Sequence, residues 1–133
     1  MMWVGIATAI MLGSGSGDDF GDLQRTLDAL RDAVREVVDD PDQRAEALHA
    51  IVDLDEVVEL VLDSAVEIAD CIERADRSYD ADREVYDRCG RQYDEAIVRI
   101  GHRYRAAERR YEAAVSDEDE RAINELVRQR IQP

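Results

Sequence analysis

The most constraining feature of the sequence is the recurrence of an apolar residue every three or four positions from Phe20 almost to the end of the chain. This spacing places the apolar side chains on one face of an α-helix. The 133 residues include two prolines, seven glycines and one Phe, too few turn formers and aromatic residues for a β-sandwich or a barrel. The sequence therefore predicts an all-α fold: an antiparallel long-helix hairpin or coiled coil with shorter flanking helices, forming a small helical bundle.

One helical domain is expected over residues 18–133. Its helices are predicted over residues 19–38, 41–77, 81–114 and 117–131. Pro41 separates the first two helices, because proline restricts the residue before it and suits the first turn of a helix. Ser116 is a suitable N-cap for the last helix. Asp53, followed by Glu56 at capping-box spacing, could kink or restart the second helix.

Charge predicts that the second and third helices pack antiparallel. Residues 53–73 contain eight acids and no base, whereas residues 88–110 contain seven Arg and three acids. A fold about residue 79 lays one segment on the other, so that residues whose numbers add to 158 face each other. The facing pairs are Ile72 with Tyr86, Ala65 with Tyr93, Val61 with Ile97, Val58 with Ile100, Leu54 with Tyr104 and Ala47 with Tyr111. One unbroken helix crossing a second copy at residue 79 would make the same contacts between chains, so both arrangements stay open.

The N-terminus differs from the rest of the chain. Residues 1–12 carry no charge, and a Gly/Ser linker at 13–17 follows them. A helix of twelve residues reaches only about 18 Å, short of the ~30 Å core of a bilayer. We interpret residues 1–17 as a signal-like or anchor remnant plus linker, which gives a membrane tether through residues 1–12. The alternative is an apolar helix end that packs on the domain.

The two cysteines, Cys71 and Cys89, lie nearly symmetrically about residue 79. Since the charge pattern brings their helices together, they are a disulfide candidate, and disulfides persist outside the reducing cytosol. This predicts an extracytoplasmic location, periplasmic or membrane-anchored. The alternative is a cytoplasmic protein in which both cysteines are small buried residues.

Composition and motifs argue against several function classes. The chain has 32 acids and 17 basic residues, all of them Arg, for a net charge of -15. Such a surface repels nucleic acid and anionic lipid. Gly-rich phosphate loops and the GxSxG and HExxH motifs do not occur in the sequence, so we expect a non-enzymatic protein that requires no cofactor.

A divalent transition metal is the one ligand that the sequence could hold. Glu46 lies three residues before His49, and Asp53 lies four residues after it, so the three could share a helix face. Glu-x-x-His is the arrangement that helical bundles use for transition metals. A second Glu-x-x-His, as a di-iron site would need, is missing from the sequence, and His102 has arginines beside it.

Three stretches of the chain carry a family resemblance. They are Phe20-Gly21-Asp22-Leu23-Gln24, then Leu48-His49-Ala50-Ile51-Val52 with Asp55 downstream, and Val115-Ser116-Asp117-Glu118-Asp119. In this order they resemble the first LTxxQ motif, the Met-His stretch between helices and the second LTxxQ motif of periplasmic Spy/CpxP-like chaperones and heavy-metal-resistance sensors. The resemblance covers residues 20 to 130 and implies an extracytoplasmic, stress- or metal-responsive homodimer, with His49 as the residue to test as a ligand.

Two function classes follow from these observations. The first is a membrane-tethered extracytoplasmic sensor or chaperone-like binder whose acidic helices hold a metal ion, a protein partner or a basic client. The second is a structural coiled coil that oligomerises or spaces other components and binds no small ligand. In either class the short first and last helices must dock to be stable. We therefore expect Leu27, Leu30, Val34, Leu126 and Val127 to be buried.

Overall fold

The computed structural model describes residues 17–77 and 83–132, with side chains from residue 21 onward, and this part of the chain is helical without a strand. Its four helices are α2 (Gly17–Val37), α3 (Pro41–Arg77), α4 (Arg83–Ala114) and α5 (Asp117–Ile131). The all-α fold is thus confirmed, and each helix end lies within two residues of its predicted position. The expected features at residues 1–16 and the turn about residue 79 lie outside the described residues.

Local sequence explains where α3 and α5 begin. The Asp40 carboxylate accepts hydrogen bonds from the backbone N–H of Asp42 and Gln43, which caps the first turn of α3 after Pro41. The Ser116 hydroxyl caps α5 in the same way by accepting from the Asp119 N–H. Asp53 lies inside α3, which continues without a break, so the capping-box spacing of Asp53 and Glu56 starts no new helix.

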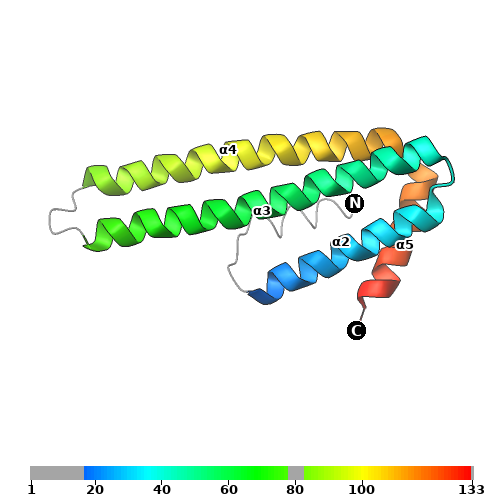
Figure 1. The fold of residues 1–133 in the computed structure, drawn as a ribbon, viewed down its shortest axis with the longest axis horizontal. Helices are drawn as coiled ribbons and strands as arrows, with labels where there is room; N and C mark the ends of the chain where they lie inside the picture. The colour runs from blue at the N-terminus through cyan, green and yellow to red at the C-terminus, as the bar shows by residue number, and fades with distance from the viewer. Residues whose placement is uncertain (1–16, 78–82, 133) are drawn as a thin grey trace.

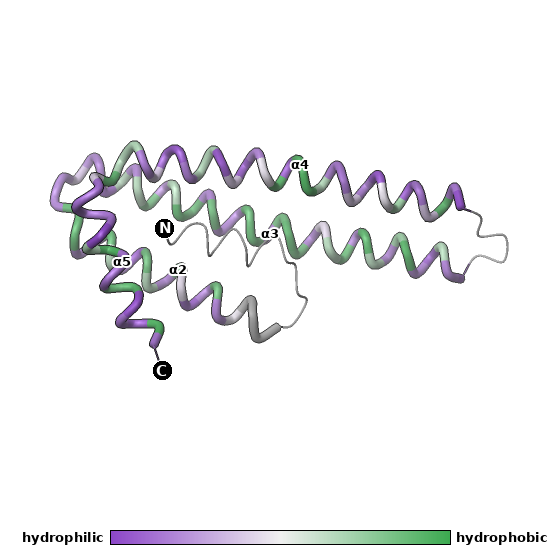
Figure 2. The backbone as a smooth tube through the Cα atoms, turned by 180° about the vertical axis from the view of Figure 1, so that it is seen from behind, coloured by the Kyte–Doolittle hydropathy of each residue, from purple (hydrophilic) through white to green (hydrophobic). Residues whose placement is uncertain are grey.

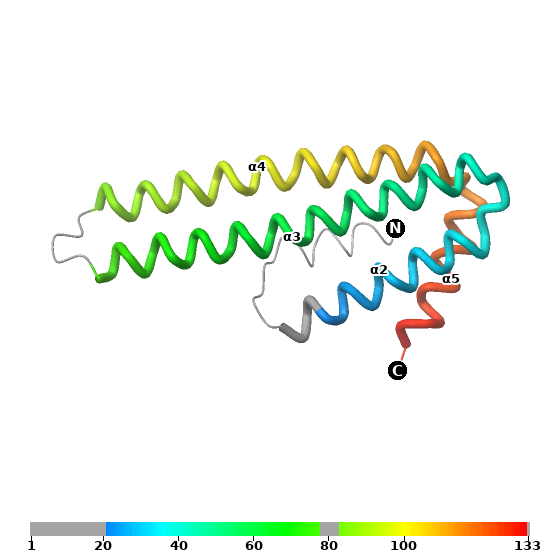
Figure 3. Tube along the Cα trace, in the orientation of Figure 1, coloured from blue at the N-terminus to red at the C-terminus, as the bar shows by residue number. Residues whose placement is uncertain are grey.

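Helices α3 and α4 lie side by side and antiparallel, and α2 and α5 cover one end of the pair (Figure 1). We call this covered end the body. The other end, made of residues 62–77 of α3 and 83–99 of α4, projects beyond α2 and α5, and we call it the arm (Figure 3). No helix in the described ranges is both long enough and apolar enough to cross a membrane.

The hydrophobic core fills the body. Of the five side chains expected there, Leu27, Leu30, Val34 and Val127 are buried and Leu126 is half-buried. The amphipathic α2 and α5 therefore dock on the long pair, as short helices must. Arg31 adds a polar link between α2 and α3, because its Nη2 lies 2.9 Å from the Asp55 carboxylate.

Residues of the predicted seam between α3 and α4 are buried in the body and largely exposed in the arm. Val58 and Ile100 are buried as expected, whereas Ile72, Tyr86 and Tyr93 are 43%, 42% and 49% exposed. Ala65, the predicted partner of Tyr93, is exposed too. In the arm the buried positions of the two helices belong instead to Ser64, Ala75, Cys89 and Ala96. Small side chains let two helices approach closely, and this rotates the larger apolar side chains of the arm to one flank.

Candidate functional site

The three predicted metal ligands come together in the structure, on one face of α3. Spacings of three and four residues place Glu46, His49 and Asp53 on this face, as expected. All three contact Arg110, which reaches across from α4. We call these four residues the Arg110 cluster.

The guanidinium of Arg110 lies between the acidic side chains. Its Nε donates to Glu46 Oε2 over 2.9 Å, and its Nη1 donates to Asp53 Oδ2 over 3.2 Å. Its Nη2 lies 3.4 Å from Glu46 Oε1 and 3.1 Å from His49 Nδ1. One cation thus contacts every side chain that a metal ion would have used.

The electrostatics of the cluster agree with this arrangement. The hydrogen bond from Arg110, together with its positive charge, lowers the pKa of the Glu46 carboxyl. In return, the hydrogen bond to Glu46 raises the pKa of Arg110. Across the described ranges 21–77 and 83–132, no group of three or more His, Cys, Asp and Glu side chains is arranged to hold a metal ion. The contacts therefore argue against the predicted metal centre, since an arginine already neutralises its acids.

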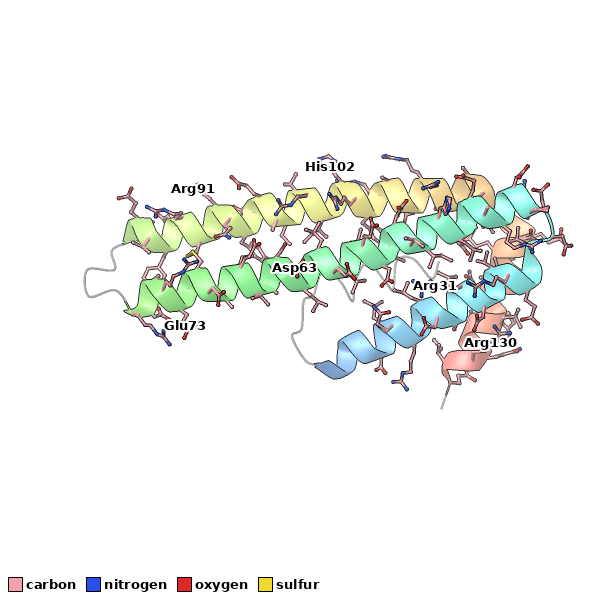
Figure 4. All side chains as sticks on the ribbon, viewed as in Figure 1. Arg31, Asp63, Glu73, Arg91, His102 and Arg130 are labelled. Atoms are coloured by element: carbon pink, nitrogen blue, oxygen red, sulfur yellow. A yellow bond between two sulfur atoms is a disulfide. The ribbon has the colours of Figure 1, made fainter. Side chains whose placement is uncertain are left out.

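Sequence reasoning overlooked Arg110 although a signal for it was available. The predicted register, with residue numbers adding to 158, places Arg110 opposite residue 48, beside Glu46 and His49. The other histidine, His102, lies on the outer side of α4, away from α3, and is exposed (Figure 4).

A disulfide joins the two helices of the arm. Cys71 of α3 and Cys89 of α4 form the bond with their Cα atoms 5.8 Å apart, and the pair is the one that the sequence suggested as a candidate. Figure 4 shows its sulfur atoms between α3 and α4 near the free end of the arm. The bond lies within one chain, so it holds α3 and α4 together as an intramolecular pair.

The arm presents an apolar surface on the flank next to the disulfide. On α3 this surface follows positions 62, 65, 69 and 72, and on α4 it follows positions 86, 90, 93 and 97; we call it the arm face. A groove of about 410 Å³, the arm groove, overlaps this face at Ile72, Tyr86, Gly90 and Tyr93, and Ile68, Cys89 and Asp94 complete its lining. Among the described residues, those that line this groove all belong to the arm.

The arm face is a continuation of the surface that forms the core. Ile72 follows Val58 by fourteen residues and Tyr86 precedes Ile100 by fourteen residues, so in each helix the two positions lie on the same side, about four turns apart. Val58 and Ile100 belong to the core, whereas Ile72 and Tyr86 are about two-fifths exposed. The same apolar stripe is therefore covered in the body and open in the arm.

Charge differs between the two sides of the arm. Helix α3 carries exposed acids along the arm at Asp63, Glu67, Asp70 and Glu73, while α4 carries exposed arginines at 83, 88, 91 and 99 among its own acids. Figure 2 shows the corresponding contrast in hydropathy, with more hydrophobic positions along α3 than along α4. The one acid that lines the arm groove is Asp94, and the net charge of the chain is -15, so the groove suits a ligand that is apolar and either uncharged or basic.

The stretches that resemble the Spy/CpxP-like family occupy three different settings. Gln24, from the first stretch, donates from its Nε2 to Asp55 of α3 over 3.1 Å, and Ser116, from the last, caps α5. The stretch around His49 lies inside α3, as the predicted helix over residues 41–77 implies. Comparisons of the chain with protein-family models, with curated proteins and with solved structures gave no match.

Proposed function

We propose that this protein is a non-enzymatic, chaperone-like binding protein of an extracytoplasmic compartment, and that it holds apolar, basic segments of client proteins on its arm face. The observation that carries the proposal is the exposure of the arm face, which continues the core stripe of the body. Contiguous apolar surface of this kind, bordered by polar residues, is typical of protein interaction sites.

Two further features support the proposed location and client. The Cys71–Cys89 disulfide favours an oxidising compartment, since thiols stay reduced in the cytosol. The net charge of -15 and the presence of Asp94 in the groove lining favour basic clients over acidic ones. The metal-responsive form of the prediction has less support, because Arg110 contacts Glu46, His49 and Asp53.

Light scattering from an aggregating client tests the proposal. A denatured basic client is diluted into buffer with the full chain, with Ile72→Asp or with Val98→Asp. Ile72 lines the arm groove and Val98, which is 57% exposed on α4, does not. We expect the native chain and Val98→Asp to suppress scattering and Ile72→Asp to lose that effect. Equal scattering with and without the native chain would refute client binding.

A structural spacer is the second candidate, and the projecting arm favours it. A pair of helices joined by a disulfide near its free end is a stiff element of defined length, as a spacer requires. A spacer would leave client aggregation unchanged, and Ile72→Asp would not alter its behaviour. The scattering experiment therefore separates the two candidates.

A further inference from the structure

The arm face is an apolar surface left exposed by the part of the chain that the structure describes, and residues 1–12 are a second apolar stretch of the same chain. We infer that residues 1–12 dock in the arm groove of the same molecule, against Ile72, Tyr86 and Tyr93. In the body, α2 and α5 cover the apolar stripe of the long helices. In the arm, residues 1–12 would cover the continuation of the same stripe. The inference concerns the same face as the proposed client site, but it does not require that a client binds.

The register between α2 and α3 places the segment at the start of the arm face. Gln24 of α2 bonds Asp55 of α3, and the two helices run in opposite directions. Gly17, seven residues before Gln24, therefore lies at the level of Leu62, seven residues after Asp55. Leu62 is the first position of the arm face and is 39% exposed. The described part of α2 thus begins level with the start of the uncovered surface.

The linker and the length of the segment agree with docking along the arm. Residues 13–16 can span up to about 14 Å in extended form. Twelve residues in helical form reach about 18 Å. From Leu62 to Ile72, α3 advances by ten residues, which corresponds to a length of about 15 Å. A segment of this size would cover the arm face from its start to beyond the disulfide.

Charge favours this occupant over a second copy of the chain. Each copy carries a net charge of -15, so two arms that meet face to face must overcome mutual repulsion. Residues 1–12 have no charged side chain and meet no such repulsion.

The fluorescence of Trp3 tests the inference, because Trp3 is the single tryptophan of the chain and lies in the segment. The experiment uses the full 133-residue chain without client, at a concentration where light scattering shows a monomer. Emission and acrylamide quenching are compared for the native chain, Ile72→Asp, Tyr93→Asp and the control Val98→Asp. The first two substitutions place a charge in the groove, and the third places it outside. Far-UV circular dichroism checks that each variant keeps its helices.

Docking predicts blue-shifted, poorly quenched Trp3 emission in the native chain and in Val98→Asp. In Ile72→Asp and Tyr93→Asp the emission should move to the wavelength of the denatured chain and quenching should rise to match it. Three results would overturn the inference: shielding that persists in both groove variants, shielding that appears only as the chain dimerises, or shielding that appears only after neutral phosphatidylcholine vesicles are added. The last would assign the segment to a membrane. Since no client is present, failed docking and failed client binding are separate results.

Discussion

Ile72 and Val58 share one face of α3, fourteen residues apart, yet Val58 is 1% exposed and Ile72 is 43% exposed. The difference arises from what lies over each residue, since both are β-branched apolar side chains in the same helix. The body supplies a cover for Val58, and the described part of the chain supplies none for Ile72. This asymmetry separates a stable core from a surface available for binding.

The Cys71–Cys89 disulfide is expected to stabilise the arm. The bond closes a sequence separation of 18 residues, and its removal in the double variant Cys71→Ser, Cys89→Ser should cost about 3 kcal/mol of unfolding free energy. Amide hydrogen exchange should accelerate in residues 62–77 and 83–99, while the buried amides of the body keep their protection. Unchanged exchange in the arm would show that helix packing alone holds it.

The state of the cysteines can be checked directly by non-reducing electrophoresis and intact mass. We expect a monomer lighter by two hydrogen atoms than the reduced chain, for protein prepared under oxidising conditions. A covalent dimer would contradict the intramolecular bond and favour the alternative in which one long helix crosses its twin.

Replacing the Arg110 guanidinium should create the metal site that it now fills. In Arg110→Ala, the side chains of Glu46, His49 and Asp53 lose their common cation and share one face of α3. We expect this variant to show a saturable rise in Tm with Zn²⁺, which His49→Ala abolishes in the double variant. The native chain should show no such rise. A His49-dependent rise in the native chain would mean that metal displaces Arg110.

The pH dependence of Glu46 gives a second test of the same cluster. Arg110 lowers the pKa of this carboxyl in the folded chain below its ordinary value of 4.5. The pair therefore stabilises the fold above pH 4.5, and this contribution is lost as the pH falls through the lowered pKa. NMR titration should find the pKa of Glu46 below its ordinary value in the native chain and close to it in Arg110→Gln. Identical titrations in both chains would contradict the contact.

The docking of α2 can be tested with two chemically identical substitutions. Val34 is fully buried in α2, whereas Val52 is 48% exposed on α3. Val34→Ala should lower the unfolding free energy by about 2 kcal/mol, since it removes two buried methyl groups and leaves a small cavity. Val52→Ala should change it by less than about 0.5 kcal/mol. Urea denaturation measures both, and equal losses would show that α2 is not part of the core.

Much of the architecture could be read from local patterns. The apolar periodicity located all four helices, and Pro41 and Ser116 marked two of their starts because capping and proline geometry depend on few neighbouring residues. Opposite charge placed α3 against α4 and brought Cys71 near Cys89. The candidate site was harder to predict. Residue spacing places Glu46 and His49 on one face of α3, but the cation that contacts them, Arg110, comes from another helix.

The sequence by itself determined the helices and their ends, because hydrogen bonding and side-chain spacing within a helix are local properties. It left open whether the antiparallel pair forms within one chain and whether Cys71 and Cys89 are bonded. Only the tertiary structure decided what each apolar face meets. A stripe of apolar residues predicts that one face of a helix is buried, but it does not predict which other part of the protein packs against that face. The close approach of α3 and α4 through Ser64, Ala75 and Ala96 rotated Ile72 and Tyr93 out of the seam, and the length of α2 and α5 left them uncovered.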